Sequence, residues 1–329
     1  ISPLSVRDVD AMLSDSLVMP EEDVHELTHL VHKRTLGNPF FLSQFLHSLH
    51  RDGLLTFDHS EGRWTWDLAG IRGMEITDNV VEFMSRKIKN LSEAGQFALS
   101  RAACFGNRFS LADLRAVADG RMDLVTEGLG EAMAYGLLFA LRLDNAAMEH
   151  TLEGADGSLR LDLCSFQFLH DRVQQAAHGL LEEDVRARIH YQAARNLMQE
   201  TNGVGDRRVF EMATHMNFAI PLLRSDDERY LAADMNLEAG RRARASAAVA
   251  SAARYLRQGI DLLPPNAWQE RYELAFDLCE EAMLGEYLSG NFTRADELAA
   301  LAIRHARSPV GEARILNIQT IQYTHRGRH

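Results

Sequence analysis

Lysine and cysteine are both scarce in this sequence, and each shortage excludes a class of function. The 329 residues include only three lysines, Lys33, Lys87 and Lys89, and none of them follows a glycine. A phosphate-binding loop of the Gly-x-x-x-x-Gly-Lys-Ser/Thr type is therefore absent. The three cysteines are widely separated and form no Cys-x-x-Cys pair, so we predict neither a disulfide framework nor a cysteine zinc site.

Long apolar runs and positive charge are also lacking. No stretch reads as a membrane-spanning helix, and the chain opens at Ile1 without a basic, apolar leader. The formal net charge of −12 repels nucleic acids and anionic membranes at long range. We expect a cytoplasmic protein without a membrane segment or a nucleic-acid partner, and we expect this chain to be a piece of a longer one.

The signals that are present predict a mainly α protein. Apolar residues at helical spacing cover most of the first 180 residues, interrupted by two predicted strand pairs. The first pair, 54–58 with 63–67, flanks a turn that contains Gly62, and the second, 136–141 with 159–168, flanks an acidic loop. Helices followed by a two-stranded wing are typical of a winged helix.

Three domains follow from the order of these signals. Residues 1–75 form a helical subdomain with a β-hairpin, and residues 76–182 form a winged-helix-like domain. Residues 183–329 are almost wholly helical and alanine-rich, and they fit a degenerate tetratricopeptide repeat of roughly 34 residues. The repeat positions are Gly240, Ala252, Leu256 and Pro264, then Gly290, Ala295 and Ala302. We expect this α-solenoid to continue beyond His329.

The segment 35–41, Thr-Leu-Gly-Asn-Pro-Phe-Phe, joins two predicted helices through a tight turn. Gly37 suits the left-handed position that ends a helix, Asn38 is a good N-cap, and Pro39 fits the first helical position. The local chemistry favours an ordinary helix corner. The alternative is a turn whose exposed backbone and proline ring border a ligand.

A second junction lies where a strand ends at Phe168 and a helix begins within Leu169-His170-Asp171-Arg172. His170 is a capping or core residue in one interpretation. In the other, its ring donates a hydrogen bond to a phosphate near the helix N-terminus, where the helix dipole also favours anions. The residues alone leave both open.

His25-Glu26-Leu27-Thr28-His29 is a literal His-Glu-x-x-His pattern on a predicted helix. In zinc hydrolases this spacing puts two imidazoles on one helical face and leaves the glutamate as general base. No distant acidic ligand can be identified, so we interpret the two histidines as solvated side chains and keep a zinc hydrolase as a minor alternative.

Together, the Gly-Asn-Pro-Phe-Phe turn, the hairpin with two tryptophans, the Thr-Asp-Asn-Val-Val helix start and the Phe-Leu-His-Asp-Arg-Val junction resemble STAND-class AAA-like signalling ATPases. The most similar members are large bacterial proteins in which a serine/threonine kinase domain precedes the ATPase. A GAF domain and a sensor histidine kinase of a two-component system follow the helical repeats in these proteins.

This resemblance implies roles for four residues. Gly37, Asn38 and Pro39 would lie in the helical lid, with Pro39 against the adenine, and His170 would reach the β-phosphate of ADP and hold a closed state. ATP or ADP with Mg²⁺ would be bound mainly by an upstream core. The repeats would bind a protein partner, and the adjacent kinase, GAF and histidine kinase domains would be partners within one chain. No catalytic or metal-binding residue is implied in this chain, which would not hydrolyse ATP alone.

Two further interpretations compete with this regulatory segment. One is a helical-repeat scaffold that binds proteins without nucleotide coupling. The other is a winged-helix transcriptional regulator, although the helix predicted near 123–135 carries Asp123, Glu127 and Glu131, with only Arg121 near its start. Such a helix is a poor surface for phosphates.

Overall fold

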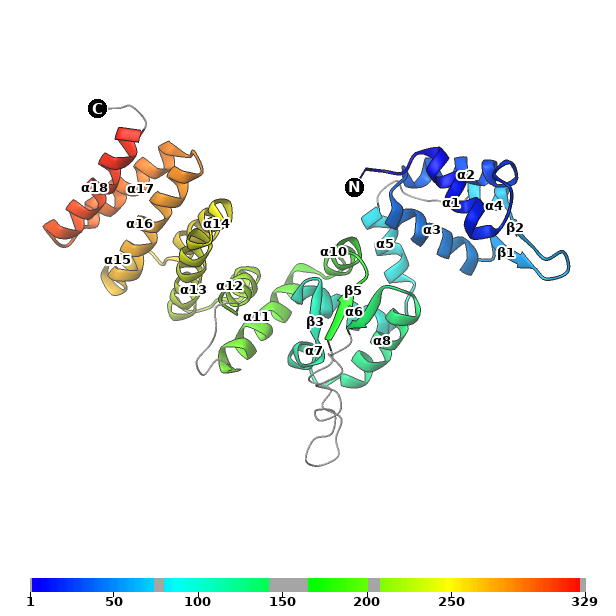
Figure 1. Cartoon of the computed structure of the whole chain (residues 1–329). Helices are drawn as coiled ribbons and strands as arrows, with labels where there is room; N and C mark the ends of the chain where they lie inside the picture. Colours follow the sequence, from blue (N-terminus) through cyan, green and yellow to red (C-terminus); the bar gives the residue numbers. More distant parts are fainter. Residues whose placement is uncertain (1, 74–79, 142–164, 201–207, 326–329) are drawn as a thin grey trace, which may run out of the picture. The chain divides into compact units, whose positions relative to one another are not determined.

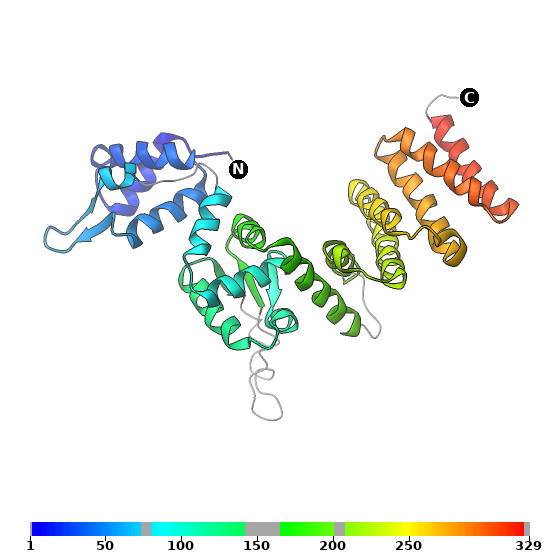
Figure 2. The ribbon, with the colours of Figure 1, turned by 180° about the vertical axis from the view of Figure 1, so that it is seen from behind.

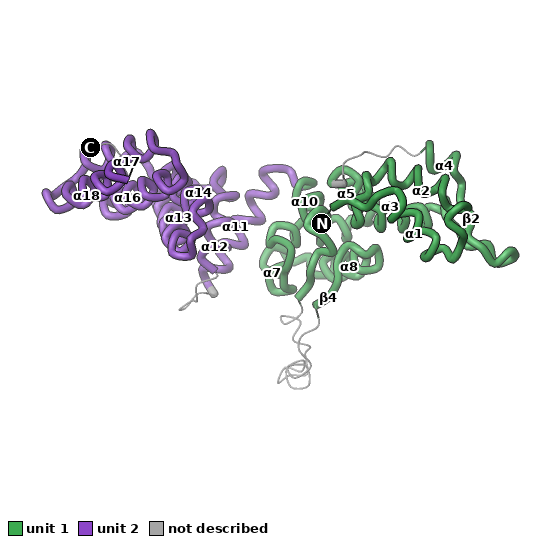
Figure 3. Tube along the Cα trace, turned by 45° about the horizontal axis from the view of Figure 1, so that its top comes forward, with its two compact units in different colours: residues 1–180 green, residues 181–329 purple. Residues whose placement is uncertain are grey.

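A computed structural model describes residues 2–73, 80–141, 165–200 and 208–325 of the chain. It is mainly α-helical with two small antiparallel sheets, as predicted (Figure 1). The chain divides into two compact units, residues 1–180 and 181–329 (Figure 3). The predicted boundary at residue 75, the strand segment 159–164 and the acidic loop fall outside the described residues.

The first unit begins with three helices, a hairpin and a short fourth helix. Ser5 and Asp8 form a capping box at the first helix, and Asn38 caps the third, whose first residue is Pro39. The apolar faces of these helices meet in one core. The elements are α1 (Val6–Leu17), α2 (Glu21–Thr35), α3 (Pro39–Arg51), β1 (Leu55–Asp58), β2 (Arg63–Trp66) and α4 (Leu68–Gly73).

The predicted hairpin is present. β1 and β2 pair antiparallel, with Leu55 opposite Trp66 and Phe57 opposite Trp64. The rings of Phe57 and Trp64 lie 5.6 Å apart, edge to face, a cross-strand aromatic pair of the kind that stabilises hairpins.

The second half of the first unit packs helices around a three-stranded sheet. The strand order is β3-β5-β4, so β5 is central and pairs antiparallel with both neighbours. The sequence predicted only the outer β4 and the central β5. The elements are α5 (Val80–Lys89), α6 (Glu93–Ala102), a 3-10 turn (Ala103–Phe105), β3 (Arg108–Ser110), α7 (Leu111–Val117), α8 (Met122–Ala134), β4 (Leu138–Leu141), β5 (Ser165–Phe168) and α10 (Asp171–Gly179).

The second unit is built from helices, and consecutive helices form antiparallel pairs. α13 packs on α14, and α16 packs on α17; seen from behind, these are the yellow and orange helices (Figure 2). The elements are α11 (Glu183–Glu200), α12 (Arg208–Phe218), a 3-10 turn (Ile220–Leu222), α13 (Asp226–Ala245), α14 (Val249–Leu262), α15 (Ala267–Glu270), α16 (Tyr272–Leu288), α17 (Phe292–His305) and α18 (Pro309–His325).

Small residues let these helix pairs approach closely, as in tetratricopeptide-like repeats. A Cβ added to Gly240 in α13 would lie 2.4 Å from Cγ of Leu256 in α14. In the next pair, Ala295 and Ala302 of α17 are buried. The extra helix α15 lies between the two pairs, which explains why the second repeat does not follow at the regular period. None of the described helices is long and apolar enough to cross a bilayer.

Candidate functional site

The turn between α2 and α3 has the predicted geometry. Leu36 and Gly37 both take left-handed backbone conformations, with φ of 50° and 69°. The Asn38 side chain accepts a hydrogen bond from the Phe41 backbone N–H at 3.0 Å, and Pro39 begins α3. Asn38 and Pro39 are exposed, so both remain accessible to a ligand.

Glycine is required at position 37 for a second reason. The Leu4 backbone N–H donates to the Gly37 carbonyl at 2.8 Å. A Cβ at Gly37 would lie 2.1 Å from the Leu4 carbonyl oxygen. The segment before α1 is therefore hydrogen-bonded to the turn, and only glycine at position 37 allows the Leu4 backbone to come this close.

His170 is the N-cap of α10. Its ring Nδ1 accepts a hydrogen bond from the Arg172 backbone N–H at 3.1 Å. A neutral ring whose Nδ1 accepts must carry its proton on Nε2. The cap thus sets the tautomer and leaves Nε2–H as a donor, for which the described residues supply no acceptor.

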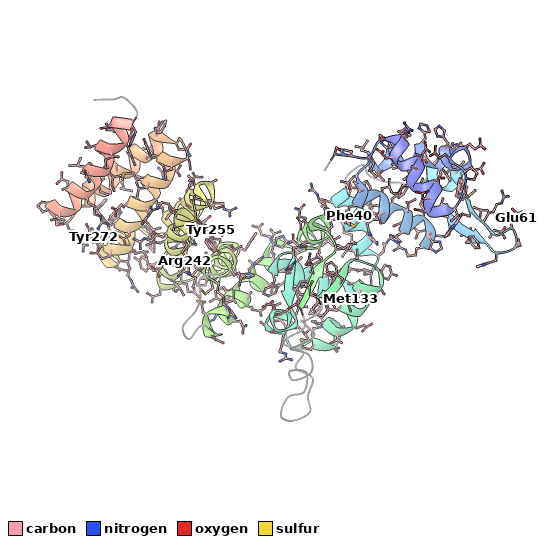
Figure 4. The ribbon with its side chains drawn as sticks, viewed as in Figure 1. Phe40, Glu61, Met133, Arg242, Tyr255 and Tyr272 are labelled. Carbon is pink, nitrogen blue, oxygen red and sulfur yellow. The ribbon has the colours of Figure 1, made fainter. Side chains whose placement is uncertain are left out.

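The structure brings the turn and His170 together. The Phe40 ring, next to Pro39, stacks on the His170 ring with centroids 4.1 Å apart and planes 18° apart. Phe40 lies at the start of α3 (Figure 4). Two segments distant in the sequence therefore meet through an aromatic stack, of which His170 is one ring, and Pro39 and Asn38 lie one and two residues before the other ring, Phe40.

Further contacts attach α3 to the helices around the sheet. Lys87 of α5 donates to Oε1 of Gln44 at 2.6 Å, and the Arg51 guanidinium lies 5.3 Å from the centre of the Tyr135 ring. Between these contacts is a cavity of about 570 Å³, which Leu169 also lines. Its volume falls within the range of small-molecule sites.

Lys87 has an unusual environment for a lysine. Only 6% of the residue is exposed, and burial, together with the nearby Arg51, lowers the pKa of its amine to about 8, which Asp52 partly opposes. Desolvation disfavours the charged form of a buried base. The sequence analysis missed this residue, although its helical position between Phe83 and Leu91 places it on an apolar face.

The His-Glu-x-x-His pattern does not assemble a zinc hydrolase site in the described residues. Nε2 of His25 and Nε2 of His29 lie 3.0 Å apart, and Nδ1 of His25 is 3.0 Å from Oδ2 of Asp10. The carboxylate of Glu26 pairs with Arg72 at 2.5 Å. No described third ligand joins the two histidines, and both are exposed to solvent.

The exposed surface of α8 is unsuited to DNA. Asp123 and Glu127 are exposed, and Arg121 pairs with Glu93 at 2.7 Å. Glu131 accepts hydrogen bonds from the backbone N–H and the hydroxyl of Ser92, the residue that caps α6. The helix therefore presents carboxylates where a DNA-binding helix presents cations.

In the second unit, charged side chains connect neighbouring helices. Arg241 of α13 bonds to Asp277 and Glu281 of α16, and Arg314 of α18 bonds to Asp277 and Glu280. A hollow of about 490 Å³ lies on α13 and the start of α16, lined in part by Leu231, Asp234 and Leu274. Burial, followed by the neighbouring Glu238, raises the pKa of Asp234.

The chain is similar in sequence to a hybrid histidine kinase. No family model matches the chain. Hybrid signal transduction histidine kinase G of Dictyostelium discoideum is 27% identical over 365 aligned positions, which cover 98% of this chain and 11% of that protein. The chain therefore spans a small part of this curated relative's length.

A crystal structure of the STAND protein with a tetratricopeptide repeat sensor from Pyrococcus horikoshii aligns with 99% of this chain and 39% of that chain. The identity is 12% and the TM-score 0.42. An alignment at this TM-score does not establish a shared fold.

Proposed function

We propose that the chain is the regulatory segment of a STAND-type signal-transduction protein, in which a nucleotide state controls a helical arm. Residues 1–75 are the lid, 76–182 a winged-helix domain and 183–329 the repeats. The observation that supports this most is the stack of Phe40 on His170. It joins the two motifs that, by resemblance, contact the nucleotide. The histidine kinase relative supports a signalling role.

His170 is the nucleotide sensor in this proposal. Its Nδ1 is occupied by the helix cap, and its Nε2–H faces the β-phosphate of ADP held by an upstream core. A donor at the N-terminus of α10 adds to the attraction of the helix dipole for an anion. Pro39 and Asn38 border the adenine, while Gly37 shapes the turn.

Helix α3 would couple nucleotide binding to the packing of the helices around the sheet. The helix begins at Pro39 and carries Phe40, Gln44 and Arg51, which contact His170, Lys87 and Tyr135. ADP bound at both the turn and His170 would hold α3 against the helices around the sheet. A nucleotide shifts this equilibrium only by its differential affinity for the closed and open states.

The repeats provide the partner-binding arm. The hollow on α13 and α16 places the exposed Leu231 beside Asp227 and Arg271. An apolar side chain with charges of both signs suits a protein surface better than a nucleic acid. The partner is a protein or another domain of the same chain, including the kinase, GAF and histidine kinase domains that the resemblance implies.

The test uses a protein extended upstream to include the nucleotide-binding core, loaded with a fluorescent ADP. His170→Asn keeps a good helix cap but removes the ring. Loss of one hydrogen bond to a phosphate should raise the ADP dissociation rate about tenfold and raise basal signalling output. His59→Asn, in the exposed hairpin turn, is the matched control.

An unchanged ADP dissociation rate in His170→Asn, with output unchanged, would reject the sensor role and leave His170 as a helix cap. His170→Ala then reports the capping contribution alone. An upstream sequence without a strand, phosphate-binding loop and helix would reject the ATPase assignment, and the chain would be a protein-binding scaffold.

A further inference from the structure

The cavity beside α3 has one polar wall and one apolar wall. The polar wall is formed by α3 residues Ser43, Gln44, His47 and Arg51, together with Lys87 of α5. None of these side chains contacts the nucleotide in the function proposed above. We therefore consider what else this cavity could bind.

Lys87 reaches this wall as a buried base without an ion-pair partner among the described residues, although Asp52, which pairs with Arg51 at 3.3 Å, acts to raise the pKa of Lys87. Its amine makes one hydrogen bond, to Oε1 of Gln44, and no carboxylate of the described residues pairs with it. An ammonium group has three N–H donors, so two remain for a ligand. Lysine is almost never this buried unless it is paired.

The other polar groups of the wall can also donate. Because Oε1 of Gln44 accepts from Lys87, the amide N–H groups of Gln44 remain available. The Ser43 hydroxyl and the His47 ring have no hydrogen-bond partner among the described residues, and neither has the hydroxyl of Tyr135 on the facing wall. None of the described lining residues carries a carboxylate. Such a surplus of donors recognises an oxyanion and repels a cation.

The facing wall comes from the end of α8 and from the residue before His170. Ala134, Tyr135, Gly136 and Leu169 form it, and the side chains of Tyr135 and Leu169 are partly open to solvent, with 37% and 43% of each residue exposed. An apolar surface opposite a donor-rich surface suits a ligand that has one charged end and an apolar body.

We propose that this cavity binds a small organic oxyanion, a carboxylate, sulfonate or phosphate with an apolar body, distinct from the nucleotide at Pro39 and His170. The anionic group accepts hydrogen bonds from Lys87 and Gln44, and the body lies against Tyr135 and Leu169. The pKa of Lys87, lowered to about 8 chiefly by burial, is consistent with an ammonium that has lost solvent and makes no direct ion pair. A bound anion would supply that charge.

The probe is 8-anilinonaphthalene-1-sulfonate, titrated by fluorescence into the full 329-residue chain. Lys87→Met keeps the aliphatic body and removes the charge, so its affinity for the sulfonate should fall about tenfold or more. Lys89→Met is the matched control, because Lys89 is exposed on the same helix, and its affinity should be unchanged. The neutral analogue 1-anilinonaphthalene should bind wild type and Lys87→Met equally.

A second measurement needs no variant. The wild-type protein is acetylated with and without the sulfonate, and tandem mass spectrometry reads Lys87 and Lys89 in the same sample. The probe should slow acetylation of Lys87 several-fold and leave Lys89 unaffected.

Four results would overturn the proposal. The first three are absence of probe binding by wild type, equal losses in Lys87→Met and Lys89→Met, and no protection of Lys87. The fourth is displacement of the probe by excess ADP, which would assign the cavity to the nucleotide site. A failure of the His170 experiment with Lys87 protection intact would reject the nucleotide proposal alone.

Discussion

The two units bury different kinds of side chain. In the first unit the core contains whole aromatic rings, because Phe41, Phe45 and Phe168 are at most 1% exposed. In the second unit alanine is the most frequent residue of the main buried cluster. Its fully buried alanines, at 0% exposed, include Ala194, Ala213, Ala232, Ala233, Ala239, Ala275, Ala299 and Ala302.

Buried polar groups differ in the same way. In the second unit Asn236 exchanges two hydrogen bonds with Asn217 and donates to the Ala232 carbonyl, so its polar atoms are satisfied within the helices. In the first unit, Lys87 and Gln44 share one hydrogen bond, which leaves further N–H donors of both side chains without a partner among the described residues. Lys87 and Gln44 therefore keep open hydrogen-bonding capacity, whereas the Asn217–Asn236 pair of the second unit does not.

The largest expected effect comes from removing volume in the first unit. Phe45 is fully buried, and Phe45→Ala should lower the free energy of unfolding by about 3 to 5 kcal/mol, because lost burial and a residual cavity add. Hydrogen exchange in peptides from α2 and α3 measures this loss. Phe57→Ala, at a residue 39% exposed, should cost less than about 1 kcal/mol; equal losses in the two variants would contradict the prediction.

Local signals in the sequence predicted the parts of the fold that local chemistry determines. Asn38 with Pro39 predicted a helix start, and α3 does begin at Pro39 with Asn38 as its N-cap. The strand β3 was missed because three residues are too few for an alternating pattern. Residues 108–110 form a strand because they pair with β5, where Phe109 lies opposite Phe166.

The next effect concerns a buried base in the second unit. His215 is 5% exposed, its Nδ1 is 2.7 Å from Nδ1 of His190, and burial lowers its pKa from 6.5 to about 4. As the pH falls from 6.5 to 4, the unfolded chain binds a proton that the folded chain does not. The free energy of unfolding should therefore drop by about 1.4 kcal/mol per pH unit, and by about 3 kcal/mol in total.

Hydrogen exchange in α12 and α13, measured between pH 7 and 4, tests the His215 prediction with corrections for intrinsic exchange. His215→Gln should flatten the pH dependence by this amount, while His59→Gln, at an exposed residue, should leave it unchanged. An equally steep dependence in His215→Gln would show that other groups cause the loss.

The candidate site was only partly predictable, because its residues meet through tertiary contacts. The sequence pattern indicated Pro39 and His170 separately, each at a helix start. Their meeting depends on the stack of Phe40 on His170, which no local pattern reveals. Lys87 was visible as a charge on an apolar helical face, but its partner Gln44 comes from another helix.

The smallest expected change in the free energy of unfolding comes from adding side-chain volume in the second unit. It tests most directly whether the two units bury different kinds of side chain. In Gly240→Ala the new Cβ meets Cγ of the buried Leu256 at 2.4 Å. Overpacking costs about 1 to 3 kcal/mol, and alanine recovers up to about 1 kcal/mol of helix propensity. The net result should be a loss of about 1 kcal/mol by denaturant unfolding.

In Gly130→Ala of α8, where an added Cβ meets nothing within 4 Å, only the helix-propensity gain should remain. The double variant Gly240→Ala with Leu256→Ala separates the two contributions, because alanine at position 256 removes the atoms that clash. The Gly240 change should then become stabilising relative to Leu256→Ala alone. If the Gly240 change stays destabilising, contact between Gly240 and Leu256 does not limit the approach of α13 to α14. The proposed difference between the units, in which the first is sensitive to removing side-chain volume and the second to adding it, would then be wrong.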